Sequence, residues 1–280
     1  MVSIMLPRAA VAANRINEIL TTEITIKDKE NAVTAKADRA VIKFNHVNFK
    51  YPDGEENILE DVDFEAKPGE TIAIIGSTGS GKSTLAKLIP RFFDVTEGSI
   101  TLDGTDIRDI SVETLRSQIG YVPQTGILFS GDINSNIAYG APGIDEKEIE
   151  EAAEIAQATE FINDKPEKYD SPISQGGTNV SGGQKQRLSI ARAIARNPKI
   201  YIFDDSFSAL DFKTDTELRK ALKPKTKDAT VFIVAQRVST ILHADKILVL
   251  DEGKLVGKGT HKELVQSCET YMQIAKSQLS

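Results

Sequence analysis

The feature that most restricts the fold of this chain is a glycine-rich segment between an apolar stretch and a helix-forming stretch. Residues 76–83 read Gly-Ser-Thr-Gly-Ser-Gly-Lys-Ser, which fits the pattern G-x-x-x-x-G-K-[ST]. The apolar run 71–76 comes directly before it, and Thr-Leu-Ala-Lys-Leu follows at 84–88. Glycines let successive backbone N–H groups turn inward around an anion, and a helix N-terminus adds partial positive charge. The segment therefore predicts a strand, loop and helix that cradle the phosphates of a nucleotide.

Two side chains of this loop have specific expected roles. Lys82 supplies a positive charge to the phosphates, and the Ser83 hydroxyl can ligate Mg²⁺. The other expected phosphate contacts come from neighbouring positions of the loop: Ser77, Thr78, Gly79, Ser80, Gly81 and Thr84. The alternative is a glycine-rich turn without a ligand, and the flanking strand and helix patterns argue against it.

A second apolar run, 200–204, ends in two carboxylates, Asp204 and Asp205. A buried parallel strand would place Asp204 beside the phosphate loop, where it can hold a Mg²⁺-bound water, and Asp205 would face the attacking water. Such a run also occurs at an ordinary strand exit. The phosphate loop elsewhere in the chain favours the metal-binding interpretation.

Composition limits the classes of partner. The 280 residues are 40% hydrophobic and 27% charged, which suits one large α/β domain or two subdomains around one core. A net charge of -7 and the absence of tryptophan argue against nucleic acid as a partner. Cys268 is the only cysteine, so an internal disulfide is excluded and a reducing cytosol fits.

The N-terminal segment differs from the rest of the chain. Residues 4–20 predict a helix and 21–38 a polar linker, so the folded domain is expected over 39–280. Residues 4–13 are mostly apolar, but Arg8 lies within the stretch and Asn14 and Arg15 directly follow it. Crossing a bilayer takes about 20 apolar residues. We therefore expect neither a complete membrane helix nor a signal peptide here.

The remaining patterns predict an α/β fold with three parts. Alternating polarity at 41–51 and 61–66 predicts antiparallel strands, and 99–107 is expected to add another strand. The apolar runs 71–76, 200–204 and 230–235 predict buried parallel strands. An inserted helical subdomain is expected at about 111–190, starting at Ser111 and including a helix over 145–158 capped by Asp145 and Glu148. Thr260 and Glu263 form a capping pattern that opens a last helix, which is expected to run to about Gln278.

A third motif carries a family resemblance. Residues 180–187, Val-Ser-Gly-Gly-Gln-Lys-Gln-Arg, closely resemble the signature of ABC ATPases, which usually reads LSGGQ followed by a basic residue. Ser181 can cap a helix and Gln184 can complete the capping box, so that free N–H groups face an anion. In the family, this anion is the γ-phosphate of an ATP bound by the opposite subunit. The resemblance implies ATP with Mg²⁺, a second nucleotide-binding domain as partner, and contacts to its ATP from Ser181, Gly182, Gly183 and Gln184.

Further matches follow in the order of the family from residue 41 onward, and they imply a P-loop NTPase of the ABC ATPase fold with a RecA-like parallel core. Tyr51 resembles the aromatic residue that stacks on adenine, although packing within the sheet is the alternative. Gln124 resembles the glutamine that touches Mg²⁺ and joins the core to the helical subdomain. Residues 208–211 resemble the loop that crosses the dimer interface, although another helix cap is the alternative. The metal set that the resemblance implies is Ser83, Gln124 and Asp204.

The flanks of these motifs point to one branch of the family. Residues 128–133, 244–247 and 257–261 resemble exporter half-transporters, including multidrug and lipid exporters. In that branch the nucleotide-binding domain follows the last transmembrane helix, and residues 4–16 resemble the end of that helix. The resemblance thus implies that 1–38 are a helix end and linker, that coupling helices of a transmembrane domain are partners, and that the protein lies at the cytoplasmic face of the plasma (inner) membrane.

Besides Val180, which replaces the usual leucine of the signature, two positions of the expected catalytic set depart from the family pattern. Asp205 stands where active ABC ATPases usually have Glu, and Gln236 stands where they usually have a switch histidine. With Gln124 they form the expected catalytic set. A carboxylate about an ångström short costs about 100-fold in rate, and glutamine cannot take up a proton. The histidines offer no replacement: His46 is expected in an N-terminal strand, His243 on a short helix and His261 at the start of the last helix.

Three functional hypotheses follow. In the first, this chain is one half of a heterodimeric exporter, with a degenerate site of its own and a signature that completes the site of a Glu-bearing partner. In the second, a homodimeric exporter has Asp and Gln at both sites. In the third, a soluble ABC ATPase acts on nucleic acid; this predicts tandem domains or coiled-coil insertions and a basic face, which the sequence lacks.

Overall fold

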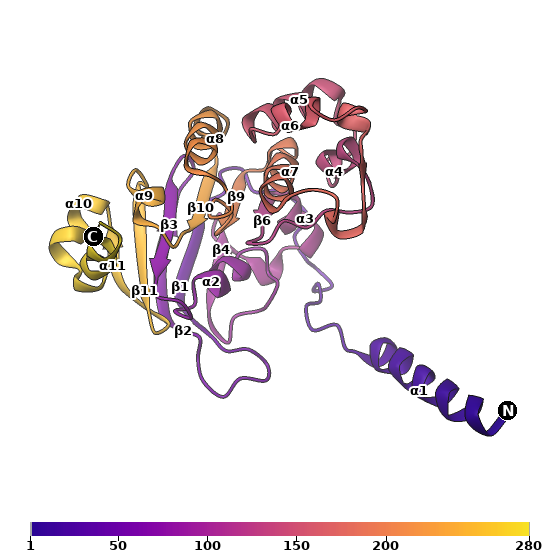
Figure 1. The fold of residues 1–280 in the computed structure, drawn as a ribbon. Coiled ribbons are helices and arrows are strands. Elements are labelled where there is room, and N and C mark those ends of the chain that lie inside the picture. The colour runs from indigo at the N-terminus through magenta and orange to yellow at the C-terminus, as the bar shows by residue number, and fades with distance from the viewer. Residues whose placement is uncertain (1, 280) are drawn as a thin grey trace.

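The computed structural model describes residues 2–279 and is organised around one curled sheet (Figure 1). Within those residues the sheet has ten strands, in the order β5-β4-β1-β2-β12-β11-β3-β10-β9-β6. The strands of this sheet are β1 (Ile42–Phe49), β2 (Leu59–Ala66), β3 (Thr71–Gly76), β4 (Glu97–Leu102), β5 (Thr105–Asp106), β6 (Ile119–Val122), β9 (Ile200–Asp204), β10 (Thr230–Val234), β11 (Lys246–Asp251) and β12 (Lys254–Gly259). The helices are α1 (Val2–Thr21), α2 (Lys82–Leu88), α3 (Val112–Ser117), α4 (Ile133–Ala138), α5 (Glu146–Ile155), α6 (Thr159–Asn163), α7 (Gly182–Ala195), α8 (Phe212–Lys225), α9 (Val238–Ile241), α10 (His261–Ser267) and α11 (Glu269–Leu279).

The sheet combines a parallel core with an antiparallel part. Strands β11, β3, β10, β9 and β6 pair in parallel, whereas β1 pairs antiparallel with β2 and β4. The two parts meet where β12 and β2 pair through Lys254 and Glu60. Every residue of β9 and β10 is buried, which explains their continuous apolar sequences. The predicted α/β architecture is therefore confirmed.

The parallel strands divide the interior into two cores, because successive side chains of a strand point to opposite faces. Ile72 and Ile74 of β3 lie in a core with Leu85 of α2 and the apolar side chains of the antiparallel strands. Ala73 and Ile75 lie in the other core, which holds side chains of α7, α8 and α11. Helix α2 is thus buried beside the sheet, and the glycine-rich loop lies between β3 and α2.

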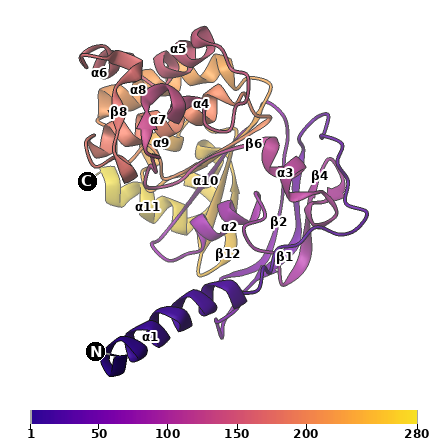
Figure 2. The same cartoon turned by 90° about the vertical axis from the view of Figure 1, so that its right-hand side faces the viewer.

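The region between α3 and α7 contains the helices α4, α5 and α6, together with β6 of the main sheet and the short paired strands β7 (Gly131–Asp132) and β8 (Pro172–Ile173). Ser111 caps α3, Asp145 and Glu148 form the capping box of α5, and Ser181 and Gln184 form that of α7. Figure 1 shows α4 to α7 grouped beyond the β6 edge of the sheet, and Figure 2 shows them on a different side of the molecule from β1, β2 and β4. Contacts of α7 with α4, α5 and β6 join this group to the core.

Two expectations for the C-terminal part were wrong. The single last helix is broken at Cys268, whose extended backbone (φ -122°, ψ 107°) separates α10 from α11. The buried Cys268 side chain packs over Gly257, where an added Cβ would lie 2.8 Å from Sγ, so a packing contact sets the break. His243 lies after the end of α9 rather than on it, and His261 begins α10 instead of the last helix.

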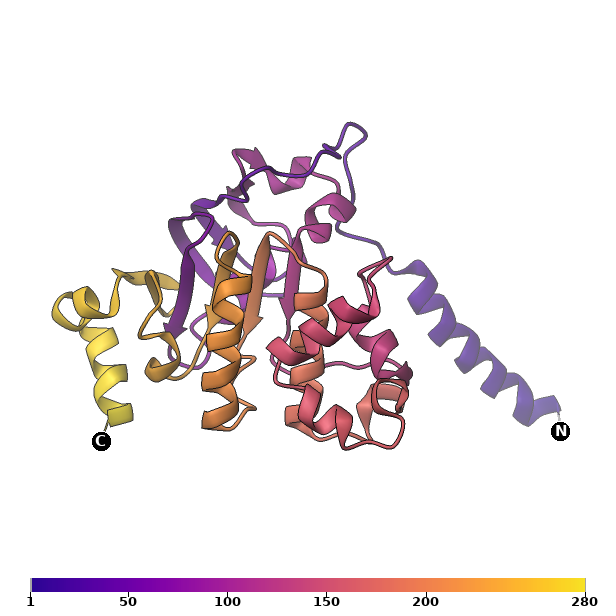
Figure 3. The same ribbon diagram turned by 90° about the horizontal axis from the view of Figure 1, so that it is seen from above.

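Helix α1 stands away from the rest of the molecule in two perpendicular views (Figures 1 and 3). Its large apolar side chains are exposed, with Ile19 77% and Leu20 78% accessible. No helix found within residues 2–279 combines the length and apolar character needed to cross a bilayer.

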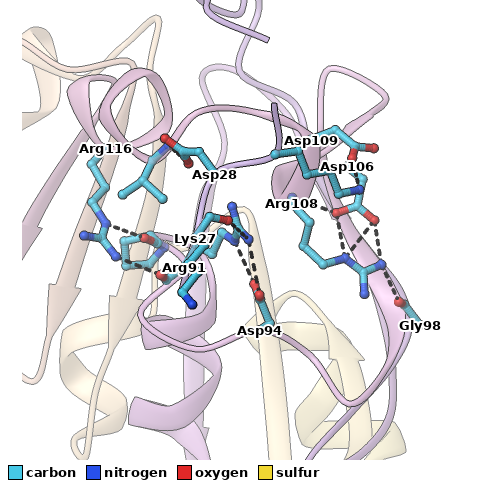
Figure 4. Close-up of polar contacts among 12 residues, drawn as sticks. Lys27, Asp28, Arg91, Asp94, Gly98, Asp106, Arg108, Asp109 and Arg116 are labelled. Atoms are coloured by element: carbon cyan, nitrogen blue, oxygen red, sulfur yellow. Dashed lines mark hydrogen bonds and ion pairs between the residues drawn. The ribbon is translucent and has the colours of Figure 1, made fainter. Parts of the chain in front are cut away.

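Residues after α1 are fastened to the folded domain around a buried arginine (Figure 4). Arg91 is 3% exposed and has a left-handed backbone, with φ 53°. Its guanidinium donates to Asp94 at 2.7 and 3.2 Å and to the Lys27 carbonyl at 3.2 Å. Asp28 next along the linker accepts the backbone N–H of Val112 at 2.8 Å. These bonds hold the linker against the loops that follow α2 and precede α3.

Asp103 organises the chain where it enters β1. Its carboxylate accepts backbone N–H groups of Arg39 at 2.8 Å, Ala40 at 3.2 Å and Val41 at 2.7 Å. Burial by itself raises the pKa of Asp103, but these hydrogen bonds outweigh it and leave the pKa below its ordinary value.

Candidate nucleotide-binding site

The glycine-rich loop needs glycine for steric reasons. Gly79 and Gly81 have positive φ, at +85° and +96°, and Gly81 is the N-cap of α2. A Cβ added at Gly81 would lie 2.9 Å from the Ile58 carbonyl oxygen, and one at Gly76 only 2.0 Å from that of Leu250. The loop can therefore pass between its neighbours only as bare backbone.

The interior of this loop is built for an anion. Lys82 Nζ donates to the carbonyl oxygens of Gly76 at 3.0 Å and Ser77 at 2.6 Å. Burial lowers the pKa of Lys82, and the nearby carboxylates Asp205 and Asp204 oppose that shift. Ser80 Oγ is buried and has no hydrogen-bond partner among the described residues. An unpaired buried hydroxyl is unfavourable, and a phosphate oxygen would satisfy it. These features fit a nucleotide phosphate.

The candidate metal ligands Ser83 and Asp204 lie side by side. Ser83 Oγ donates to Asp204 Oδ1 at 2.7 Å, although the two residues come from α2 and β9. The Tyr121 hydroxyl donates a hydrogen bond to the other Asp204 oxygen, Oδ2, at 3.0 Å. Burial and the Asp204 charge raise the pKa of Tyr121, so this phenol remains a donor. Hydroxyl and carboxylate oxygens next to a phosphate site fit Mg²⁺.

All three predicted catalytic residues meet at one atom. Asp205 Oδ2 accepts Gln124 Nε2 at 3.0 Å and Gln236 Nε2 at 2.6 Å. Asp205 is 6% exposed and has a left-handed backbone with φ 50°. Burial raises the pKa of Asp205, with a further increase from Asp204, while the hydrogen bonds from the glutamines act in the opposite sense. Gln124 is bonded to Asp205 rather than to the Ser83–Asp204 pair.

Tyr51 lies next to the start of α2 and also packs within the sheet. Its hydroxyl is 3.1 Å from Thr84 Oγ1, beside the phosphate loop. Its ring meets Phe49 and Phe93 edge to face, with centroids 4.9 and 5.1 Å apart. The Tyr51 ring thus packs against other aromatic rings, as in the packing alternative, while its stacking on adenine stays a prediction.

The signature segment 181–184 lies apart from the phosphate loop. Ser181 accepts the Gln184 N–H at 3.3 Å and donates its own N–H to Gln184 Oε1 at 3.0 Å. Gly182 has open space around it, with no atom within 4 Å of an added Cβ. Helix α7 contacts α4, α5 and β6, whereas α2 contacts β3, β9 and β10. Ser181 and Gly182, at the N-terminus of α7, are exposed.

Two residues that hold the site together were not predicted from the sequence. Tyr121 binds Asp204, and Gln186 Nε2 donates to the Pro123 carbonyl at 3.1 Å, which ties α7 to the segment that precedes Gln124. Tyr121 could have been found from the sequence, because its hydroxyl is the only polar side-chain group in the apolar stretch 119–122. Gln186 follows the signature and is 1% exposed, which no local pattern indicated.

The phosphate loop, the adjoining Ser83 and Asp204 pair and the capped signature helix define a nucleotide-binding protein of the P-loop class with an inserted helical region. Comparison with known proteins narrows this class. The sequence profile of the family "ABC transporter" matches residues 59–208.

The relatives agree with that profile. An uncharacterized ABC transporter ATP-binding protein of Mycobacterium tuberculosis is 44% identical over 98% of this chain and 47% of that protein. A putative multidrug export ATP-binding/permease protein of Bacillus subtilis is 44% identical over 97% of this chain and 47% of its own length. A bacterial Atm1-family ABC exporter with ATP bound superimposes with a TM-score of 0.91 and 35% identity, covering 100% of this chain and 49% of that one. The chain thus spans about half the length of these relatives, and it belongs to the ABC transporter family.

Proposed function

We propose that this chain is the ATP-binding domain of an ABC exporter half-transporter whose own site holds Mg-ATP and hydrolyses it slowly. The names of the relatives support the export function, since they include a multidrug export ATP-binding/permease protein and an Atm1-family exporter. In this proposal residues 1–38 are the end of the last transmembrane helix and a linker, 39–280 are the nucleotide-binding domain, and about 111–190 are its helical subdomain. The domain works at the cytoplasmic face of the membrane.

The phosphate loop carries the binding step. Lys82 and the backbone N–H groups of residues 77–84 would bind the phosphates, and Ser80 Oγ would gain its missing partner. Ser83 and Asp204 would hold Mg²⁺, which neutralises charge on the phosphates when bound. Tyr51 would contact the adenine. ATP bound in this way would join the domain to a second nucleotide-binding domain, and domain closure and opening would move the coupling helices of the transmembrane domain.

The observation that carries the proposal of slow hydrolysis is the contact of Asp205 with two glutamines. Asp205 Oδ2 accepts hydrogen bonds from Gln124 and Gln236, so this oxygen is turned toward protein donors. An aspartate is one methylene shorter than the usual glutamate, and misplacing a reacting group by about 1 Å costs about 100-fold in rate. Gln236 can donate to a γ-phosphate but cannot change its charge.

The signature helix supports the proposal of a heterodimer. The Ser181–Gln184 capping box is intact and its N-terminus is exposed, so it is suited to bind the γ-phosphate of a partner's ATP. A partner with glutamate at the position that corresponds to Asp205 would then hydrolyse ATP at the site that this chain completes. In a homodimer, both composite sites would carry Asp205 and Gln236.

The test uses the purified 280-residue chain. We expect it to bind ATP and hydrolyse it slowly, Lys82→Ala to lose ATP binding, and Asp205→Glu to raise turnover by about tenfold or more. Asp205→Asn is the matched control, and it should change the slow turnover little. Equal turnover of the wild type and Asp205→Glu, together with a large loss in Asp205→Asn, would show that Asp205 is an effective catalytic base.

Purification of the native transporter tests whether the second half-transporter differs in sequence from this chain. Purification of the complete membrane protein should recover a second half-transporter of different sequence with glutamate at the position of Asp205. Recovery of a single polypeptide species with full transport activity would favour the homodimer instead.

A further inference from the structure

The C-terminal helix reaches the nucleotide site through one side chain, that of Gln278 in α11. The Gln278 Oε1 atom accepts the backbone N–H of Val238 at 2.7 Å, and Nε2 donates to the backbone carbonyl of Gln236 at 2.7 Å. One amide therefore bonds to the chain at both ends of the segment 236–238. This segment follows β10 and carries the glutamine that contacts Asp205.

Helix α11, which carries Gln278, is held in place by packing into the core. Tyr271 is fully buried and Ala275 is 6% exposed, and both belong to the core that also contains Ala73 of β3. Tyr271 OH lies 2.7 Å from His261 Nδ1, which joins α11 to α10. Positions 271, 275 and 278 are spaced to share one face of a helix. The face of α11 that packs into the core therefore also carries Gln278, whose polar side chain lies next to the segment 236–238.

The two hydrogen bonds require an amide. A glutamine side chain has one carbonyl acceptor and an NH₂ donor, and both are used here. Glutamate at 278 would keep the bond from Val238 but could not donate to the Gln236 carbonyl. Alanine would remove both bonds and leave Gln236 tethered to the core only through its own side chain and its neighbours.

We propose that Gln278 is a positioning residue that holds the backbone of Gln236 so that its side chain can reach both Asp205 and the γ-phosphate of ATP. This inference rests on the proposed function, in which ATP binds at Lys82 and Gln236 faces its terminal phosphate. ADP lacks the γ-phosphate, so Gln278 contributes to the preference for ATP over ADP and leaves ADP binding unchanged.

The experiment measures Mg-ATP and Mg-ADP affinity of the 280-residue chain by titration calorimetry, under conditions where the slow hydrolysis is negligible. Gln278→Ala should weaken ATP binding about fivefold and leave ADP binding within about twofold, as expected for the loss of hydrogen bonds that orient one contact. The ATP affinity of Gln278→Glu should lie between those of the wild type and Gln278→Ala. Thermal melting checks that each variant is folded.

Two controls separate positioning from a general structural effect. Gln273→Ala removes a glutamine from the same helix whose only side-chain hydrogen bond, among the residues that the structure describes, is to Glu269 within α11, and it should leave both affinities unchanged. In a Gln236→Ala background, Gln278→Ala should have no further effect on ATP binding, because the group that it positions is gone.

Three outcomes would overturn the inference. The first is an equal loss of ATP and ADP affinity in Gln278→Ala, and the second is an undiminished Gln278→Ala effect in the Gln236→Ala background. Both would leave the proposed function in place if the wild type binds ATP and Lys82→Ala does not. The third is a wild-type chain that binds neither nucleotide, which would overturn the proposed function together with this inference.

Discussion

Replacing Arg91 by alanine should release the linker and destabilise the whole domain. The Arg91 side chain is 4% exposed, and it makes its three hydrogen bonds with Asp94 and the Lys27 carbonyl (Figure 4). Removing one partner of a buried ion pair costs about 3–5 kcal/mol. The Asp94 side chain is 35% exposed, so water can solvate it in the variant. We therefore expect the free energy of unfolding to fall by less than this range, about 2–3 kcal/mol, or the melting temperature to fall by about 4–12 °C.

Thermal unfolding followed by circular dichroism measures this loss, and limited trypsin digestion measures the release of the linker at Lys27. Arg108→Ala is the matched control, because Arg108 also bonds to an aspartate, Asp106, and to a carbonyl, that of Gly98, but is 33% exposed. Arg108→Ala should lower the free energy of unfolding by less than about 1 kcal/mol and leave cleavage at Lys27 unchanged. Equal melting temperatures of the two variants, or an Arg91→Ala melting temperature within about 2 °C of the wild type, would contradict this role of Arg91.

Three further perturbations test separate parts of the structure. Gly81→Ala forces a side chain into a left-handed position facing the Ile58 carbonyl, and calorimetry should show ATP affinity at least about tenfold weaker. Ser181→Ala removes the cap of α7 and should cost about 1 kcal/mol in urea unfolding while leaving ATP affinity at the chain's own phosphate loop unchanged. The pKa of Asp103 is depressed in the folded state, so its stabilisation is present above the unfolded value of about 4 and is lost as pH falls through the folded pKa. Asp103→Asn should therefore flatten the acid side of a stability profile measured between about pH 2 and 7.

Local patterns in the sequence were sufficient for much of the fold. The capping boxes at Asp145, Ser181 and Thr260 depend on residues three positions apart, so the sequence alone predicts them. The apolar runs that became β3, β9 and β10 were also found, because parallel strands buried on both faces leave a continuous signal.

The missed features depend on residues far apart in the chain. The break at Cys268 follows from packing against Gly257 in β12, and the last helix looks continuous without that neighbour. Arg91 meets Lys27 across 64 positions, and Gln278 meets Gln236 across 42. Long polar side chains that bond to distant backbone atoms have no periodic pattern. Such contacts were therefore outside the reach of sequence reasoning, although one of them adjoins the candidate site.

The geometry around Asp205 also changes how the two departures from the family pattern relate to each other. In the sequence, Asp205 and Gln236 are separate substitutions, 31 positions apart, but Gln236 Nε2 donates to Asp205 Oδ2 at 2.6 Å. The Asp205 backbone is held by its own N–H bond to the Val234 carbonyl and by the Ser208 hydroxyl on its carbonyl, at 3.0 and 2.8 Å. A change in either side chain would therefore remove a hydrogen-bond partner of the other. This coupling supports the proposal that the site is adapted to retain ATP, because the short carboxylate and the amide fit one another as a pair.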